Sequence, residues 1–436
     1  MSPGRPNREM TLNGGVVDNN DENREDNAML GQFSNAQQIR KPAVVSKGGI
    51  VAAQSRKAAE VGAEVLGAGG DCVDAVIATT FALGVLEPWM SGLGGGGAMV
   101  LYRARENRFE VIGMRAPGSL RPEDYPLAGD GAASDIFPWA RAKDDRNLHG
   151  PGLIAVPGVV AGMEEAHRRH AKLPWQELLG PSVNLTDQGL SVDWWTTLMI
   201  ASAAADLRRY PASAAAYLED GLPPNAQWGI RSCVRLPQDG LKATLAHLAV
   251  RGPRDFCEGD LARSIAADVQ AGGGALSVDD LASFRAYVRE PLAIPYRGGK
   301  VYATPELTCG PTLAHALRLL QENLQPRRGG PDASAYTAYA RALQSAYWER
   351  LQDMGDADGR RALGAEHLAP ACTTHFSVVD REGNMAAVTQ TLLSSKKLED
   401  DEGVKGCGLT VIIDSPGATW PPHLILDVRF DRHHAL

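Results

Sequence analysis

Alternation between apolar and polar positions is clearest at residues 373–392, which read TTHFSVVDREGNMAAVTQTL. Two alternating runs, 376–379 and 385–388, flank the turn signal REGN. Short alternating runs joined by a segment that contains Gly and Asn are typical of a β-hairpin. The pattern therefore predicts two antiparallel strands here, and the rest of the chain is interpreted around them.

Threonines stand at the open end of this predicted hairpin, with Thr373 and Thr374 entering it and Thr389 and Thr391 leaving it. The ordinary interpretation is structural, because the branched Cβ of Thr suits a pleated strand. A threonine that begins a buried strand also has a chemical use. If the preceding peptide bond is cut, the new α-amine lies beside the hydroxyl and can take its proton, which activates the oxygen as a nucleophile.

The pattern near the N-terminus predicts a strand and a helix. Residues 49–53 form a short apolar run, which predicts a buried strand. Ser55 is a suitable N-cap for a helix through Leu66, ended by the glycines at 69–70. We expect Ala59, Ala63 and Leu66 to lie on one face of this helix.

A second helix is predicted at 73–85, capped by Asp71 and so apolar that it should be buried all round. The run SGLGGGG at 91–97 follows, then strands at 98–102 and 108–112. The order helix, glycines, strand is the reverse of a nucleotide-binding loop, and no Gly-Lys-Ser/Thr is present. A turn that allows close backbone approach fits the glycines better.

Helices dominate the middle of the chain. The helix after Val156-Pro157-Gly158 ends in HRRH at 167–170, which we interpret as a solvated last turn that complements the helix dipole and not as a metal site. Further helices are predicted at 194–210, 241–250, 260–270, from 310 and at 334–354, with strands at 292–296 and 300–303. Residues 359–372 are expected to form an exposed loop.

Composition limits the class of protein. The 436 residues allow two ordinary domains or one large α/β domain, and a net charge of -8 without a basic stripe argues against nucleic acid as a partner. Six scattered cysteines without a C-x-x-C pair indicate free thiols and no metal site. The sequence has no apolar run of about 18 residues and no signal peptide, so we expect no membrane association and a cytoplasmic location. Residues 1–47 have the composition of a disordered leader.

Six blocks, in this order and spacing, resemble the γ-glutamyltransferase (γ-glutamyl transpeptidase, glutathione hydrolase) family. They are GIVA at 49–52, GGDCVDA at 69–75, EPWMSGLGGGG at 87–97, VPG at 156–158, LPW at 173–175 and TTHFSVVD at 373–380. The resemblance implies an α/β fold, the four-layer αββα sandwich of N-terminal-nucleophile hydrolases, with a largely helical large-subunit region at 48–372 and a small-subunit-like region at 373–436.

The resemblance also implies the site residues. The precursor would cut itself between Cys372 and Thr373, Thr373 would be the nucleophile, and the Thr391 hydroxyl would orient it. Arg115 is the candidate for binding a substrate carboxylate, to which a guanidinium is suited. It directly precedes Ala116-Pro117, whereas the family has two residues between, and the alternative is a surface arginine at a strand end.

The region after Thr391 departs from the family pattern. Only 64 residues (436 − 372) run from Thr373 to the end. The family's small subunit is more than twice as long. Leu393 and the pair Ile412-Ile413 stand where the family has asparagines. We therefore expect a truncated small-subunit-like region and an incomplete C-terminal part of the fold.

The function that the resemblance implies is cleavage of γ-glutamyl amides, such as glutathione, through a threonine ester that passes to water, an amino acid or a peptide. No metal or organic cofactor is implied, and self-cleavage would give a heterodimer of a large and a small chain. Two alternatives stay open: an acylase or amidohydrolase of the same fold that acts on another side-chain amide, and a truncated, inactive homologue.

Overall fold

The computed structural model describes residues 44–114, 126–132, 140–145, 150–225, 234–306, 308–325, 330–353, 372–393, 408–409, 411–414 and 428–429. Apart from Val44 and Val45, they belong to one compact unit, Ser46–Gln227 with Cys233–Leu436. The second unit comprises Met1–Val45 and Trp228–Ser232. The predicted leader lies almost wholly outside the described residues, as does the predicted loop at 359–372 except for Cys372, and the three-part division of the chain stays a prediction.

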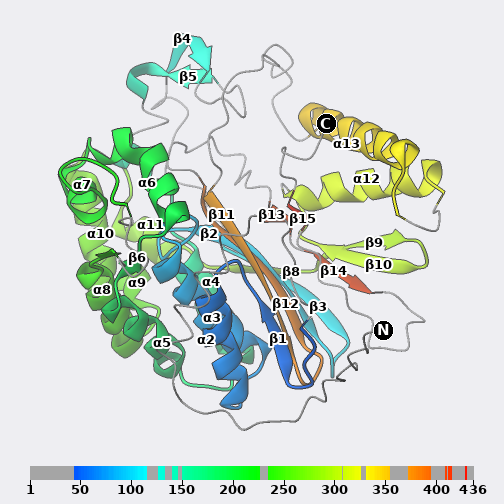
Figure 1. The fold of residues 1–436 in the computed structure, drawn as a ribbon, viewed down its shortest axis with the longest axis horizontal. Helices are drawn as coiled ribbons and strands as arrows, with labels where there is room; N and C mark the ends of the chain where they lie inside the picture. The colour runs from blue at the N-terminus through cyan, green and yellow to red at the C-terminus, as the bar shows by residue number, and fades with distance from the viewer. Residues whose placement is uncertain are drawn as a thin grey trace, which may run out of the picture. The chain divides into compact units, whose positions relative to one another are not determined.

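An antiparallel sheet of six strands contains the predicted hairpin (Figure 1). The hairpin is confirmed as β11 and β12, and Gly383 adopts a φ of 82° in its turn, a conformation that favours glycine. In sheet order the strands are β1 (Gly49–Ala52), β11 (Cys372–Asp380), β12 (Met385–Leu393), β2 (Gly96–Arg103), β3 (Arg108–Gly113) and β8 (Tyr287–Arg289).

Strand β1 corrects one prediction. Among the strands that the structure describes it pairs only with β11, at an edge of the sheet, and its residues alternate between partly buried and exposed. Ile50 is 38% exposed, so the apolar run is not a buried strand as expected. An apolar run of four residues does not distinguish an edge strand from a central one, because that depends on which strands pair with it.

Helices pack on one face of this sheet through the largest core cluster. They are α2 (Arg56–Gly67), α3 (Cys72–Leu86), α4 (Val159–His170), α5 (Trp175–Asp187) and α8 (Asp239–Arg251). Helix α3 is buried nearly throughout, as predicted, and Asp71 and Asp74 form a capping box at its start. The hairpin packs on this helix: Asp380 accepts a hydrogen bond from the Cys72 amide at 3.0 Å.

Helix α2 begins after its predicted N-cap, since Ser55 accepts a hydrogen bond from the Ala58 amide. Of the three residues expected on one face, Leu66 packs against the core, Ala59 is partly buried and Ala63 is exposed. The buried residues are Ala58, Val61, Gly62 and Val65. Gly62 permits this face, because a Cβ there would lie 2.3 Å from the Thr79 hydroxyl of α3.

The other face of the sheet contacts a second antiparallel sheet, β9 (Leu292–Tyr296), β10 (Gly299–Ala303) and β14 (Val411–Asp414). The Phe109 and Tyr302 rings stack between the two sheets with centroids 3.6 Å apart. Helix α12 (Cys309–Asn323) packs on β9 and β10 and contacts α13 (Ala333–Asp353). The described residues thus form a mixed α/β fold built on antiparallel sheets.

The remaining elements are shorter or lie among the helices. They are β4 (Leu127–Ala132), β5 (Ala140–Ala142), β6 (Leu190–Ser191), α6 (Trp194–Leu207), α7 (Pro211–Tyr217), β7 (Arg235–Leu236), α9 (Asp255–Glu258), α10 (Asp260–Ala271), α11 (Val278–Ser283), β13 (Gly408–Leu409) and β15 (Val428–Arg429). None of the helices in the described part of the chain has the length and apolar character needed to cross a bilayer.

The basic end of α4 is only partly the solvated turn that was predicted, since Arg168 is exposed whereas His170 is not. Arg169 lies 2.9 Å from Glu110 of β3, and His170, whose side chain is 6% exposed, bonds the other oxygen of the same buried carboxylate. Burial raises the pKa of Glu110, but the hydrogen bonds from His170 and Arg169 outweigh it and lower the pKa to about 2. These contacts tie α4 to the sheet.

Candidate active site

The two threonines predicted to act together lie opposite each other at the open end of the hairpin. Thr373 and Thr391 are register partners, and the Thr373 hydroxyl donates to the Thr391 oxygen at 3.0 Å. Residues directly opposite in an antiparallel pair project to the same face, which explains the contact. Thr391 is buried, whereas Thr373 is only partly buried.

The strand pairing is irregular at the bond between Cys372 and Thr373. Thr373 pairs with Thr391 but Cys372 pairs with Leu393, so Leu392 is an extra residue on β12. The Leu392 amide instead donates to the Met90 carbonyl at 3.4 Å. A bulge therefore lies at the peptide bond where the family resemblance implies cleavage, and cleavage itself stays a prediction.

Further polar side chains continue along the same face of the hairpin. The ring of His375 bonds the Thr389 hydroxyl through Nδ1 at 2.8 Å, and its Nε2 lies 3.4 Å from the Ser377 hydroxyl. His375 is 5% exposed. Since alternate residues of a strand share a face, Thr373, His375 and Ser377 form one row.

The glycine run lies against the second strand of the hairpin, and its last two glycines, Gly96 and Gly97, begin β2. A Cβ at Gly95 would lie 2.6 Å from the Thr391 carbonyl oxygen, and one at Gly97 would lie 2.2 Å from that of Thr389. The Gly95 carbonyl also accepts hydrogen bonds from the amides of Gly158 and Val159, at the start of α4. The glycines therefore permit a backbone approach that a side chain would prevent.

Sequence reasoning missed a group of buried polar residues on the opposite, helix-facing side of the hairpin. Thr374 donates to the Glu87 carboxylate at 3.3 Å, and its register partner Gln390 donates to the Ser91 hydroxyl at 3.0 Å. A signal existed: Thr374 and Gln390 interrupt the apolar row that packs on α3, and Glu87 follows directly after an apolar helix.

Of the other predicted site residues, Cys372 is the first residue of β11. Arg115 lies outside the described residues. Met114, the residue before Arg115, is fully buried, and the Met114 amide donates to the Gly97 carbonyl at 2.9 Å. A Cβ at Gly158 would lie 1.9 Å from the Met114 carbonyl oxygen. The structure thus brings Thr373 and Thr391 together and leaves the role of Arg115 a prediction.

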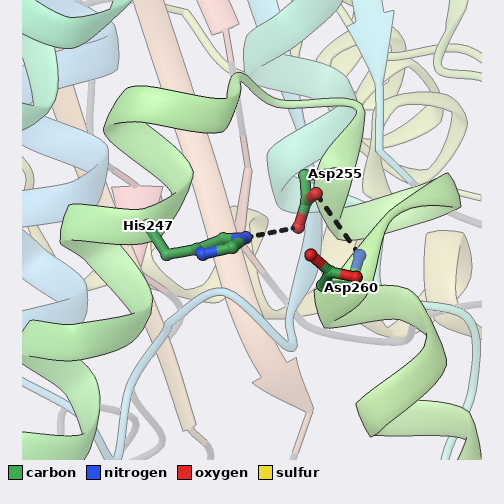
Figure 2. A group of neighbouring side chains, drawn as sticks. All are labelled: His247, Asp255 and Asp260. Carbon is green, nitrogen blue, oxygen red and sulfur yellow. Dashed lines mark hydrogen bonds and ion pairs between the residues drawn. The ribbon is translucent and has the colours of Figure 1, made fainter.

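One group in the described part of the chain has the residue types of a metal site, His247, Asp255 and Asp260 (Figure 2). The Asp255 carboxylate is already bonded: it accepts from His247 at 2.8 Å and from the amides of Asp260 and Leu261 at 3.3 and 3.2 Å. Those amides begin α10, so Asp255 acts as its cap. We interpret the group as a structural anchor between α8 and α10.

The open end of the hairpin carries a hydroxyl pair, Thr373 on β11 and Thr391 on β12, and is a candidate nucleophile site, as the family resemblance implies. The sequence profile of the gamma-glutamyltranspeptidase family matches residues 58–372. The chain belongs to this family, and the resemblance found in the sequence is confirmed.

The chain is also similar in sequence to individual proteins. The chain is 32% identical over 383 residues to Acylase ACY 1 proenzyme of Pseudomonas sp. (strain V22), covering 81% of the chain and 66% of the acylase. It is 28% identical over 391 residues to the Glutathione hydrolase proenzyme of Escherichia coli (strain K12), covering 80% of the chain and 63% of that protein. The chain therefore spans slightly less than two thirds of the length of either relative.

The fold of the chain is also similar to that of a solved structure. The structure of cephalosporin acylase from Bacillus halodurans matches with a TM-score of 0.67 at 23% identity, covering 91% of this chain and 76% of that one. This likeness supports the fold and does not bear on the substrate.

Proposed function

We propose that the chain is a self-processing amide-cleaving enzyme whose nucleophile is Thr373, within the four-layer αββα arrangement of its family. The observation that carries this proposal is the hydrogen bond between the Thr373 and Thr391 hydroxyls at 3.0 Å. Thr373 is also the first residue after the segment that matches the family profile. Thr373 is only partly buried, as a residue that meets a substrate must be, whereas its partner Thr391 is buried.

The first reaction is self-cleavage. The Thr373 hydroxyl oxygen attacks the Cys372 carbonyl carbon, the C–N bond breaks, the nitrogen takes the proton, and an ester joins Cys372 to Thr373. Water then hydrolyses the ester, which leaves a carboxylate on Cys372 and a free α-amine on Thr373. The products are a large and a small chain that remain associated as a heterodimer, because β11 and β12 stay paired with β1 and β2.

The second reaction uses the new α-amine. The amine takes the hydroxyl proton, and the oxygen attacks the substrate's amide carbon and forms an ester. The Thr391 hydroxyl orients the attacking oxygen. The leaving amine departs with the proton, and water or an acceptor amine releases the acyl group. No step requires a metal or an organic cofactor.

We propose γ-glutamyl amides such as glutathione as the first substrate class. A second candidate is the amide of a side chain that lacks the α-amine, such as a glutaryl group. The identity to an acylase, 32%, against 28% to a glutathione hydrolase, favours retaining this second class. Cytoplasmic location and the absence of nucleic-acid and membrane partners stay predictions.

Intact mass measurement tests the proposal. Purified wild type should give two fragments that meet at Cys372 and Thr373, Thr373→Ser should give the same fragments, and Thr373→Ala should remain one chain. A single chain in all three proteins would refute the proposal. Processed enzyme would then be assayed with γ-glutamyl and glutaryl anilides, and the faster of the two assigns the substrate class.

A further inference from the structure

A group of buried polar residues lies behind the candidate nucleophile, on the helix-facing side of the hairpin. We name Glu87, Ser91, Thr374 and Gln390 the Glu87 clamp. Their exposed fractions are 7%, 0%, 0% and 1%, so all four are removed from solvent. Two belong to the turn that follows α3, and two are register partners on β11 and β12.

The contacts of the clamp join both strands to one turn. Thr374 donates to the Glu87 carboxylate at 3.3 Å, and the Gln390 side-chain nitrogen donates to Ser91 at 3.0 Å and to the Thr80 carbonyl at 3.4 Å. The turn itself is fixed, because the Glu87 carbonyl accepts hydrogen bonds from the amides of Met90 and Ser91.

Stability alone gives no reason for polar residues at these positions. The next residues along the same face, Phe376 and Val378 on β11 and Val388 on β12, are apolar and pack in the core with α3. Burying a carboxylate is costly, and replacing a buried polar group by a well-packed apolar one is often neutral or stabilising. What the hydrogen bonds add is a fixed geometry at the strand end.

Self-cleavage makes that geometry necessary. Once the bond before Thr373 is cut, β11 begins at Thr373, and the first residue of a chain frays unless it is held. Thr374 is the next residue, and its side chain extends from the opposite face to Glu87. A tether at Thr374 therefore limits the movement of Thr373 while its hydroxyl and α-amine stay free to react.

We propose that Glu87 is a positioning residue that acts through Thr374 to hold the new N-terminal threonine after self-cleavage, an inference that rests on the proposed function. Glu87 contacts neither the Cys372–Thr373 bond nor the substrate in this scheme. The hydrogen bond requires an acceptor at position 87 and a hydroxyl at position 374, and it does not require the negative charge.

Four variants separate positioning from stability. Thr374→Val removes the hydroxyl and keeps the shape, whereas Thr374→Ser keeps the hydroxyl. Glu87→Gln keeps an acceptor without the charge. Thr79→Val is the matched control, because Thr79 is a fully buried threonine of α3 whose hydroxyl has no hydrogen-bond partner among the described residues.

The readouts are the rate of self-cleavage and the kcat and KM of processed enzyme with the better anilide substrate. Thr374→Val should lower kcat about 10–100-fold, since a displacement on the order of 1 Å has such an effect, with KM nearly unchanged. Thr374→Ser and Glu87→Gln should retain most of the wild-type kcat, and the kcat of Thr79→Val should match that of wild type. Equal rates for Thr374→Val and Thr79→Val, or a change confined to KM, would overturn the inference.

Amide hydrogen exchange distinguishes this inference from the proposed function. A wild-type chain that stays uncut refutes self-cleavage, yet the clamp still predicts about tenfold faster exchange near Thr374 in Thr374→Val than in Thr79→Val. Equal exchange in the two variants refutes the clamp, whether or not the chain is cut.

Discussion

A single methyl group added at Gly97 should disrupt the hairpin's contact with the glycine run. The added Cβ would lie 2.2 Å from the Thr389 carbonyl oxygen and 3.0 Å from the Gln390 Cα. Both are backbone atoms of β12, so no side-chain rotation relieves the overlap. Strands β2 and β12 must separate by about 1 Å to restore ordinary contact, which stretches their hydrogen bonds beyond normal length.

The expected cost follows from these contacts. Overpacking costs about 1–3 kcal/mol, and weakening about two hydrogen bonds adds about 2 kcal/mol, so we expect Gly97→Ala to lower the free energy of unfolding by about 3–5 kcal/mol. Gly94→Ala is the matched control from the same run. Gly94 is exposed, and a Cβ there meets nothing within 4 Å. Its effect should stay within about 1 kcal/mol.

Equilibrium urea unfolding of both variants in a Thr373→Ala background measures these costs on uncut chains. Self-cleavage in the otherwise wild-type background should also slow for Gly97→Ala, because Thr391 lies two residues from Thr389 on the displaced strand. Equal unfolding free energies for Gly97→Ala and Gly94→Ala would refute the argument that backbone approach requires glycine at position 97.

Two further predictions concern charge and hydroxyl groups. The folded state lowers the pKa of Glu110 from 4.5 to about 2, so the ionised Glu110 carboxylate stabilises the fold above pH 4.5. This contribution should be lost as the pH falls from 4.5 to about 2. Allowing for solvent screening, we expect wild type to lose about 2 kcal/mol of its unfolding free energy over this range that Glu110→Gln does not lose, and parallel pH profiles in urea unfolding would contradict this. Thr391→Val should slow self-cleavage about 10–100-fold in an intact-mass time course, whereas Thr391→Ser should retain most of the rate, because only the hydroxyl bonds Thr373; equal rates in the two variants would count against the orienting role.

Sequence patterns predicted the helices and strands that are determined by residues close together in the chain. The hairpin followed from alternation around a turn, and α3 followed from an Asp71 cap and a continuous apolar run. The resemblance implied the pair Thr373 and Thr391, and their contact agrees with the hairpin, since antiparallel strands bring their open ends together.

The predictions from sequence failed for residues whose burial and contacts depend on a segment far away in the sequence. The end of α4 looks solvated in sequence, but Glu110 of β3 lies against it. The buried face of α2 was not predicted in full, because Gly62 admits α3 more closely than a pattern of apolar residues reveals. Glu87 was missed for the same reason: its partner Thr374 is 287 residues away in sequence. Such pairings depend on the folded sheet.

Among the hydrogen bonds between the hairpin and α3, two lie at opposite ends of β11: Asp380 accepts from the Cys72 amide at the start of the helix, and Thr374 donates to Glu87, its C-cap. The fifteen residue steps from Cys72 to Glu87 span about 22 Å in a helix, and the six steps from Thr374 to Asp380 span about 20 Å in a strand. The helix and the strand are therefore matched in length. Inserting one residue in the middle of α3 would turn Glu87 by about 100° and shift it by about 1.5 Å. Both hydrogen bonds could not then be made together, so this pair of contacts constrains the length of the helix.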